Sequence, residues 1–150
     1  MSNIKLNALF KNVCIASDHA GYDLKEDIKN YLINKNVSIF DLGPYEKQSV
    51  DYPDYAKKLG NRIKLKKSDV GILVCGSGTG MAISANKIRS IRAAVCDNLK
   101  STRLSRQHNN ANIIAIGSRL TKKKLSLKLV EMVLKTKFEG GRHLRRVKKI

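Results

Sequence analysis

Several features that mark whole classes of protein are missing from this sequence. It has no tryptophan, no apolar run approaching the roughly 18 residues of a membrane-spanning helix, and no secretory signal at its start. Its three cysteines are an odd number without metal-ligand spacing, which argues against a disulfide framework and against a zinc site. We therefore expect a protein of the reducing cytoplasm, without membrane contact and without bound metal.

Acidic residues are scarce as well, with 12 Asp and Glu against 30 Lys and Arg and a formal net charge of +18. Such a charge raises nucleic acid as a partner, because lysine and arginine neutralise phosphates and release counterions. The lysines, Lys25 and Lys29 among them, are scattered rather than clustered, and only five tyrosines and three phenylalanines are available to stack on bases. A solvated basic surface without a specific nucleic-acid partner is favoured, and a nucleic-acid-binding module is kept as a remote alternative.

Length and composition indicate a single domain over residues 1–150. This is a common size for one hydrophobic core, and 42% hydrophobic with 28% charged residues is ordinary for a globular protein. Residues 1–12 form a polar lead whose order the sequence leaves open, and residues 138–150 form a basic C-terminal segment.

Apolar runs alternate with segments of helical periodicity along the chain. The clearest run, Val70–Cys75, is apolar throughout, as in a parallel strand that is covered on both faces. The expected strands cover 13–17, 37–42, 70–75, 91–96 and 113–116, and the expected helices cover 22–32, 55–63, 81–88, 99–108 and 121–137. This alternation, with right-handed crossovers, predicts an α/β fold, namely a Rossmann-like three-layer α/β/α sandwich with a five-stranded parallel sheet.

Polar or reactive residues follow three of the expected strands, at the carboxyl ends where such sheets bind ligands. They are Asp18-His19, then Cys75 with the turn Gly76-Ser77-Gly78-Thr79-Gly80, and Asp97. The glycines let backbone N–H groups approach a ligand, and the helix that follows adds partial positive charge. The turn is therefore predicted to bind anionic oxygen.

A dinucleotide site is the rival interpretation of this glycine turn. Asp97 ends the next strand about 20 residues later, where an acidic residue would bind a ribose. The spacing, however, is G-x-G-x-G instead of G-x-G-x-x-G, and the motif follows the third strand and not the first. A nucleotide-binding oxidoreductase therefore stays a remote alternative.

Cys14 and Cys75 have different expected roles. Cys14 lies in the middle of a strand and is interpreted as a core residue, the usual state of a free thiol. Cys75 emerges beside the glycine turn and a helix N-terminus, which is an environment that favours a thiolate base or nucleophile.

Other candidate residues have both a functional and a structural interpretation. Asp18 with His19 suits proton transfer or phosphate contact, although Asp18 is also a favoured helix N-cap. His108 lies near a helix C-terminus, where complementing the helix dipole is the favoured interpretation from the residues alone. Arg142 and Arg146 share a helical face and suit one phosphate, unless the segment is only a frayed basic tail.

Six stretches of the chain carry a resemblance to a known family. They are, in order, SDHAGYDLK, DYPDYA, GILVCGSGTGMAISANK, IRAAVC, RLSRQHNNANIIAIGSR and FEGGRHLRRV, and they span nearly all of the chain after the first dozen residues. The chain resembles the B-type ribose-5-phosphate isomerases, which are grouped with the galactose-6-phosphate isomerase subunits. The resemblance implies an aldose-ketose isomerase of the pentose phosphate pathway. It would interconvert ribose 5-phosphate and ribulose 5-phosphate through a cis-enediolate, without metal or cofactor.

The resemblance also implies catalytic roles for residues of the glycine turn. Cys75 corresponds to the base that moves a proton between carbons 2 and 1 of the sugar, and Ser77 corresponds to a hydroxyl that assists proton transfer at the sugar oxygens. The turn amides match the family's enediolate cradle, at Gly76, Gly78 and Gly80.

The resemblance also implies roles for residues elsewhere in the chain. His108, supported by Asp18, would open the furanose ring, Asn109 would contact the substrate and Tyr52 would line the sugar site. The phosphate would be bound by His19, Arg119, Arg142 and Arg146. In the family the cleft is completed across a dimer interface, which implies a homodimer here, or a tetramer.

Two details place the chain within the family it resembles. Some relatives lack the cysteine and carry a glutamate base after the glycine turn, whereas this chain has Cys75 and, at the corresponding position, Met81. Galactose-6-phosphate isomerases divide their site residues between two different subunits, whereas this chain holds both Cys75 and His108. A homo-oligomer acting on a pentose phosphate is favoured, and an isomerase of six-carbon sugar phosphates, allose 6-phosphate or galactose 6-phosphate, is the alternative.

Overall fold

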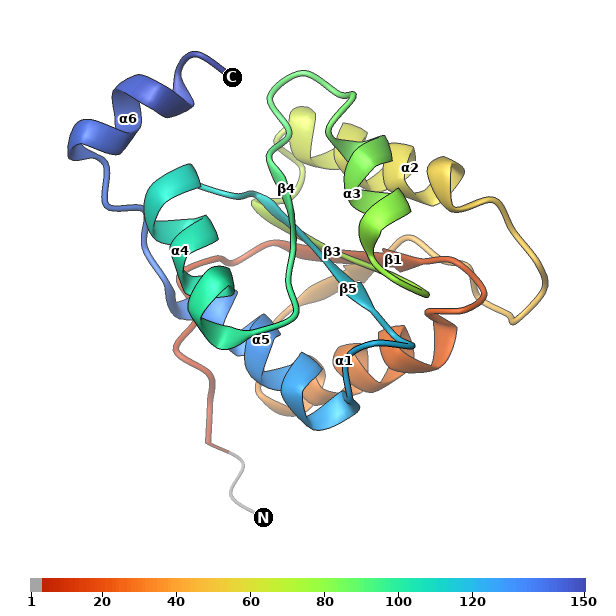
Figure 1. Ribbon diagram of the computed structural model, residues 1–150. Helices are drawn as coiled ribbons and strands as arrows, with labels where there is room; N and C mark the ends of the chain where they lie inside the picture. Colours follow the sequence, from red (N-terminus) through yellow and green to blue (C-terminus); the bar gives the residue numbers. More distant parts are fainter. Residues whose placement is uncertain (1–3) are drawn as a thin grey trace.

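Five strands form one parallel sheet in the computed structural model, which describes residues 4–150 (Figure 1). The strands are β1 (Val13–Ser17), β2 (Ile39–Asp41), β3 (Val70–Cys75), β4 (Ala93–Val95) and β5 (Ile113–Gly117). The helices of the described residues are α1 (Tyr22–Asn34), α2 (Tyr52–Lys64), α3 (Thr79–Ala85), α4 (Leu99–Asn109), α5 (Lys123–Lys135) and α6 (Gly141–Val147). The predicted α/β fold with its five-stranded parallel sheet is confirmed.

The order of the strands defines where a ligand can bind. The sheet runs β2-β1-β3-β5-β4, so β2 and β3 lie on opposite sides of β1 and the direction of winding reverses there. In open parallel sheets, ligands bind beyond the carboxyl ends of the strands at such a reversal. The register pairs Ser17 with Val74 and Cys75 with Gly117, which brings the carboxyl ends of β1, β3 and β5 to the same edge.

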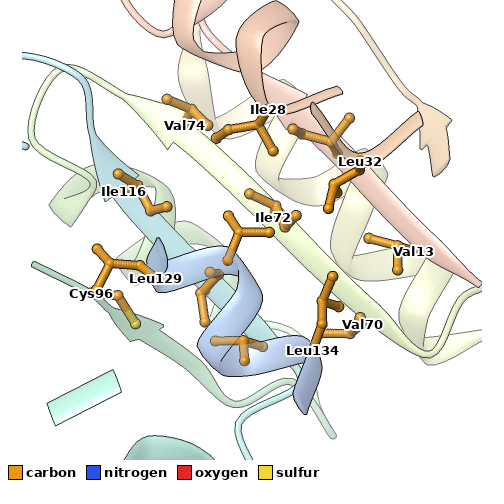
Figure 2. Packing of buried hydrophobic residues seen from close by; sticks show 14 of the residues in the cluster. Val13, Ile28, Leu32, Val70, Ile72, Val74, Cys96, Ile116, Leu129 and Leu134 are labelled. Atoms are coloured by element: carbon orange, nitrogen blue, oxygen red, sulfur yellow. The ribbon is translucent and has the colours of Figure 1, made fainter. Parts of the chain in front are cut away.

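Alternate residues of β3 face the two sides of the sheet. Ile72 belongs to a cluster with Ile28 of α1 and Leu129 of α5 on one side (Figure 2). Leu73 and Cys75 belong to a second cluster, which α2 and α3 cover on the other side (Figure 1). The burial of both faces explains why the strand is apolar throughout, and it gives the turn after Cys75 a rigid support.

Two strands are shorter than the sequence predicts. The run over 37–42 is a strand only at Ile39–Asp41, because the Val37 N–H bonds to the Leu32 carbonyl and closes helix α1. The run over 91–96 is a strand only at Ala93–Val95, where the side chain of Asn86 satisfies both backbone groups of Ala93 at 2.8 and 2.9 Å. Both contacts occupy backbone groups outside the strand ladder, and neither has a periodic signal in the sequence.

Two helices also end earlier than expected. The helix expected over 81–88 spans Thr79–Ala85, and the helix expected over 121–137 spans Lys123–Lys135. The backbone is extended at Lys122 and at Thr136, which sets both ends of the second helix.

The described part of the polar lead packs against the helices α1 and α5. Leu6 is buried in the cluster formed by α1 and α5, and its N–H donates to the Lys35 carbonyl at 3.1 Å. The Leu9 N–H donates to the Leu134 carbonyl at 2.8 Å. This part of the lead therefore packs on the fold, while residues 1–3 lie outside the described residues. None of the helices described over 4–150 has the length and hydrophobicity to cross a membrane.

One lysine counted with the solvated surface is buried instead. Lys25 has a fully buried side chain, and its Nζ lies 2.7 Å from Asp41 and 3.0 Å from Glu26. Lys29 pairs with the same two carboxylates at 2.9 and 2.8 Å. The Asp41 carboxylate also accepts the N–H of Gly43 at 2.8 Å, so the network holds the loop that follows β2.

Candidate active site

The carboxyl edge of the sheet gathers residues from three strands. Asp18 and His19 follow β1, the glycine turn follows Cys75 of β3, and Arg119 follows β5. The Asp18 N–H bonds to the Val74 carbonyl at 3.1 Å, which ties the β1 loop to the end of β3. Asp18, His19 and the glycine turn, predicted from their strand ends, are therefore brought together in one chain, and Arg119, which only the resemblance assigned, lies beside them.

Cys75 is placed beside an amide donor. Its side chain is buried, with 4% of the residue exposed, and its Sγ accepts the N–H of Gly78 at 3.1 Å. Gly78 has φ +79°, a left-handed backbone that aims this N–H back at the sulfur and that other residues rarely adopt. The turn thus places a backbone N–H donor directly at the Cys75 sulfur.

The glycine turn is packed too closely for larger residues. A Cβ atom on Gly80 would lie 2.7 Å from the Tyr52 ring, so Tyr52 covers the turn from the start of α2. A Cβ on Gly117 would lie 2.6 Å from the Ser77 backbone. Ser77 itself is exposed, and its Oγ accepts the Thr79 N–H at 3.3 Å. The Ser77 hydroxyl is therefore accessible at the mouth of the site.

Asp18 and His19 are held by different contacts. Asp18 is buried and its Oδ1 accepts the N–H of Gly21 at 2.9 Å. Gly21 is the N-cap of α1, so the N-cap interpretation of Asp18 is wrong and the carboxylate instead fixes the β1–α1 loop. His19 is exposed, and its Nδ1 accepts the Val50 N–H at 3.2 Å, which puts the proton of the neutral ring on Nε2.

Arg119 brings a positive charge to the turn. Its N–H donates to the Gly76 carbonyl at 3.0 Å, and its Nη1 would lie 3.2 Å from a Cβ on Gly76. The side chain is exposed, so the guanidinium is free to bind an anion in front of the turn. Together with the turn amides, it places positive charge at this edge, which suits an anionic ligand.

The other predicted residues lie at the opposite edge of the sheet. Helix α4 runs back from the carboxyl edge and ends with His108 and Asn109, just before β5 starts at Ile113. Helix α6, which carries Arg142 and Arg146, lies beside this end of α4, away from the glycine turn (Figure 1). Because β5 spans five residues at about 3.3 Å each, the two groups are roughly 13 Å or more apart within one chain.

Two residues without a predicted role surround His108. Its ring stacks on His143 with centroids 4.1 Å apart and planes at 12°, and the Glu139 carboxylate lies 3.9 Å from His108 Nε2 and 3.6 Å from His143 Nε2. The partial burial of His143 and the neighbouring His108 lower the pKa of His143, which favours its neutral ring. The Glu-x-x-x-His spacing was the only sequence signal for this group, because the approach to His108 depends on tertiary contacts.

The group His108, Glu139 and His143 is the one set of three His, Cys, Asp or Glu side chains within 4–150 whose ligand atoms lie close enough for a metal ion.

Asp97, the residue on which the dinucleotide alternative depends, is exposed and follows β4, which β5 separates from β3. An acidic residue there is too far along the sheet to serve a ribose bound at the glycine turn. The geometry therefore gives no support to the dinucleotide alternative.

These features define the class of the protein as an α/β enzyme that acts on a small anionic substrate, with a buried thiol beside an anion-binding turn. Comparison with known proteins gives the family. The model of the family described as ribose/galactose isomerase matches residues 13–150, and the chain belongs to this family. The resemblance predicted from the six sequence stretches is confirmed.

Individual relatives match over almost their whole length. The chain is 40% identical to ribose-5-phosphate isomerase B of Escherichia coli over 140 residues, which is 93% of this chain and 94% of the relative. A crystal structure of a ribose 5-phosphate isomerase from Thermotoga maritima is 50% identical with a TM-score of 0.90, covering 92% of this chain and 95% of that one. A Mycoplasma genitalium ribose-5-phosphate isomerase B with bound ribulose-5-phosphate is 41% identical with a TM-score of 0.88, at 92% of both chains.

Proposed function

We propose that this protein is a B-type ribose-5-phosphate isomerase that interconverts ribose 5-phosphate and ribulose 5-phosphate with Cys75 as its base. The observation that carries the proposal is the Cys75 sulfur held 3.1 Å from the Gly78 N–H at a carboxyl strand end. The relatives named for this activity, one of them with bound ribulose-5-phosphate, support the choice of substrate.

The reaction needs a base, an anion site and no net oxidation. The Cys75 thiolate takes the proton from carbon 2 of the open aldose, and the electron pair of that C–H bond forms the enediolate between carbons 1 and 2. The developing charge on the sugar oxygens lies toward the amides of the turn, where an oriented N–H is worth several kcal/mol of barrier. The resulting Cys75 thiol, whose proton exchanges with solvent, then protonates carbon 1 in the forward direction or carbon 2 in the reverse direction, while Ser77 assists proton transfer between the two oxygens.

Met81 occupies the position of the glutamate base that some relatives carry. Met81, at the position where some relatives carry a glutamate, is fully buried in the cluster between α2, α3 and the sheet. It offers no proton acceptor, so proton transfer falls to Cys75.

The phosphate and the ring-opening step require residues from both edges of the sheet. His108, Asn109, Arg142 and Arg146 cannot reach the Cys75 of their own chain across the length of β5. In a homodimer, the amino edge of one copy meets the carboxyl edge of the other, and two complete sites form. The separation within one chain thus supports a homodimer with shared sites, in which Asp18 of one copy supports the partner's ring-opening histidine.

Proton exchange with solvent tests the activity directly. The purified protein in deuterated buffer, without added metal or cofactor, should introduce deuterium at carbon 2 of ribose 5-phosphate, read by NMR. Absence of exchange contradicts the proposal. A thermal shift with a nicotinamide dinucleotide would instead favour the oxidoreductase alternative, and salt-sensitive binding to nucleic acid would favour the nucleic-acid-binding module.

Kinetics on five-carbon and six-carbon sugar phosphates, measured side by side, test the choice of substrate. We expect a higher kcat/KM on ribose 5-phosphate than on allose 6-phosphate or galactose 6-phosphate.

The expected cytoplasmic location belongs to the same proposal and is supported by three free, buried cysteines, which suit a reducing compartment.

A further inference from the structure

The cluster of His108, Glu139 and His143 has the composition of a transition-metal site. Two imidazoles and one carboxylate are ligands that Zn²⁺ takes readily, whereas Mg²⁺ and Ca²⁺ prefer oxygen ligands alone. The Glu139 N–H also donates to the Gln107 carbonyl at 3.0 Å, which fixes the segment before α6 against the end of α4.

The distances between the ligand atoms of the cluster are close to those in a tetrahedral metal site. Zn–N and Zn–O bonds of about 2.0–2.2 Å in a tetrahedron place the ligand atoms roughly 3.3 Å apart. The Glu139 oxygen lies 3.9 and 3.6 Å from the two Nε2 atoms, and the three ligand atoms all lie within 4.8 Å of one another. Glu139 is half-exposed on a segment outside the helices, so a small movement of its carboxylate and a turn of the stacked rings closes the set.

We propose that His108, Glu139 and His143 bind a divalent transition-metal ion such as Zn²⁺, and that the bound ion inhibits the enzyme by occupying the His108 nitrogen. The inhibitory part rests on the proposed function, in which His108 opens the furanose ring. An imidazole nitrogen bonded to a metal neither accepts nor donates a proton, so ring opening stops while the ion is bound.

The surroundings set the expected strength of the site. Arg142 and Arg146 are on the same short helix as His143, and their positive charge opposes a cation. Only three protein ligands are present, and Glu139 is the single negative one. We therefore expect reversible binding in the micromolar range instead of the tight binding of a structural zinc site.

Calorimetry with Zn²⁺ tests binding without reference to activity. The titrations use the Cys75→Ala background, which removes the competing thiol of the glycine turn. Adding Glu139→Gln or His143→Phe should weaken Zn²⁺ binding by about tenfold or more, and the phenyl ring keeps the stack on His108. Glu46→Gln, which changes an exposed carboxylate of another loop, is the matched control and should leave binding unchanged. Equal affinity in all four proteins would overturn the site.

Two activity measurements then locate the inhibition. Turnover of ribose 5-phosphate requires ring opening, whereas exchange of the carbon 1 protons of ribulose 5-phosphate does not, because this ketose is acyclic. Zn²⁺ should suppress turnover and leave exchange within about twofold, and Glu139→Gln should relieve the suppression. Equal loss of both activities, unaffected by Glu139→Gln, would place the ion on Cys75 and overturn the proposal. If neither activity exists, the proposed function fails, while calorimetry still decides the binding site.

Discussion

The three cysteines of this chain differ in the surroundings of their sulfur atoms. Cys14 is fully buried in the cluster of α2 and α3, and burial raises the pKa of its thiol to about 11. Burial also raises the pKa of Cys96. Cys75 is the one whose sulfur accepts a backbone N–H, from Gly78 at the start of α3. The same residue type is therefore inert at two positions and suited to catalysis at the third.

Replacement of Cys75 by alanine should separate catalysis from binding. Loss of a general base lowers kcat by roughly 10²–10⁴-fold. Substrate affinity should change little, because the turn amides and Arg119 remain. Stopped assays with ribose 5-phosphate and calorimetric titration of substrate measure the two quantities. Cys14→Ala is the control and should cost about 1 kcal/mol of stability with full activity. Substantial turnover by Cys75→Ala would reject the role of this thiol.

Asp41 links stability to pH through its lysine partners. Burial alone would raise the pKa of Asp41, but hydrogen bonds from Lys25, Lys29 and the Gly43 N–H outweigh it and lower the pKa. A lowered folded-state pKa contributes stability that is present above the ordinary carboxyl value of about 3.9 and is lost as the pH falls through the folded-state pKa.

Asp41→Asn should therefore make the free energy of unfolding less dependent on pH in the acid range. We expect a loss of about 3 kcal/mol at pH 7, since Lys25 keeps only Glu26 and Lys29 as neighbours in the network. Below pH 4 the difference from the wild type should shrink. Urea unfolding at several pH values measures both effects, and a constant difference between the proteins down to acid pH would contradict the linkage.

At the scale of elements, the site depends on how closely β5 packs on the glycine turn. Gly117 ends β5 opposite Cys75, and its missing side chain lets the Ser77 backbone approach. The Ser118 N–H then donates to the Cys75 carbonyl at 2.8 Å. Strand β5 therefore pairs with β3 in the sheet and also positions the amides of the turn.

Gly117→Ala should move the turn and reduce activity. Its Cβ would meet backbone atoms at 2.6 Å, which cannot give way locally, and a displacement of about 1 Å in a site costs roughly 10²-fold in rate. Gly60→Ala, in α2, is the matched control, because its Cβ would meet the flexible tip of Ile88 at 2.5 Å. Thermal unfolding and kcat compare the two variants; equal activity would show that the turn tolerates the shift.

At the scale of the whole molecule, the candidate residues form two groups at opposite edges of the sheet. Cys75 with its turn lies at the carboxyl edge, and His108 with α6 lies at the amino edge. In the proposed homodimer, each copy supplies two half-sites, and a symmetric pair with the same surfaces facing each other would complete both sites at once.

Mixing two inactive variants tests the shared site. Cys75→Ala and His108→Asn each remove one half-site, and a mixed dimer retains one complete site built from both chains. Co-refolding in equal amounts should recover about one quarter of wild-type activity, because half of the dimers are mixed and each has one of two sites. The double variant on one chain, mixed with itself, is the control. Failure to recover activity would mean that each site lies within one chain.

The sequence by itself determined the order of strands and helices, the reactive turn from Cys75 to Gly80 and the family. These depend on local periodicity, on turn residues and on contiguous motifs, which a single chain displays directly. Strand ends at β2 and β4 could not be predicted from periodicity, because other contacts occupy the backbone groups: the Leu32 carbonyl accepts the Val37 N–H before β2, and the Asn112 side chain accepts the Arg92 N–H before β4.

Only the tertiary structure decided that Lys25 is buried and that His108 stacks on His143 beside Glu139. It also decided that His108 and Cys75 lie at opposite edges of the sheet, since the direction of α4 relative to β5 follows from the crossover and not from either motif. Contacts between residues far apart in the chain have no local pattern. The candidate residues of each group could thus be named from the sequence, whereas their neighbours in space were set by packing.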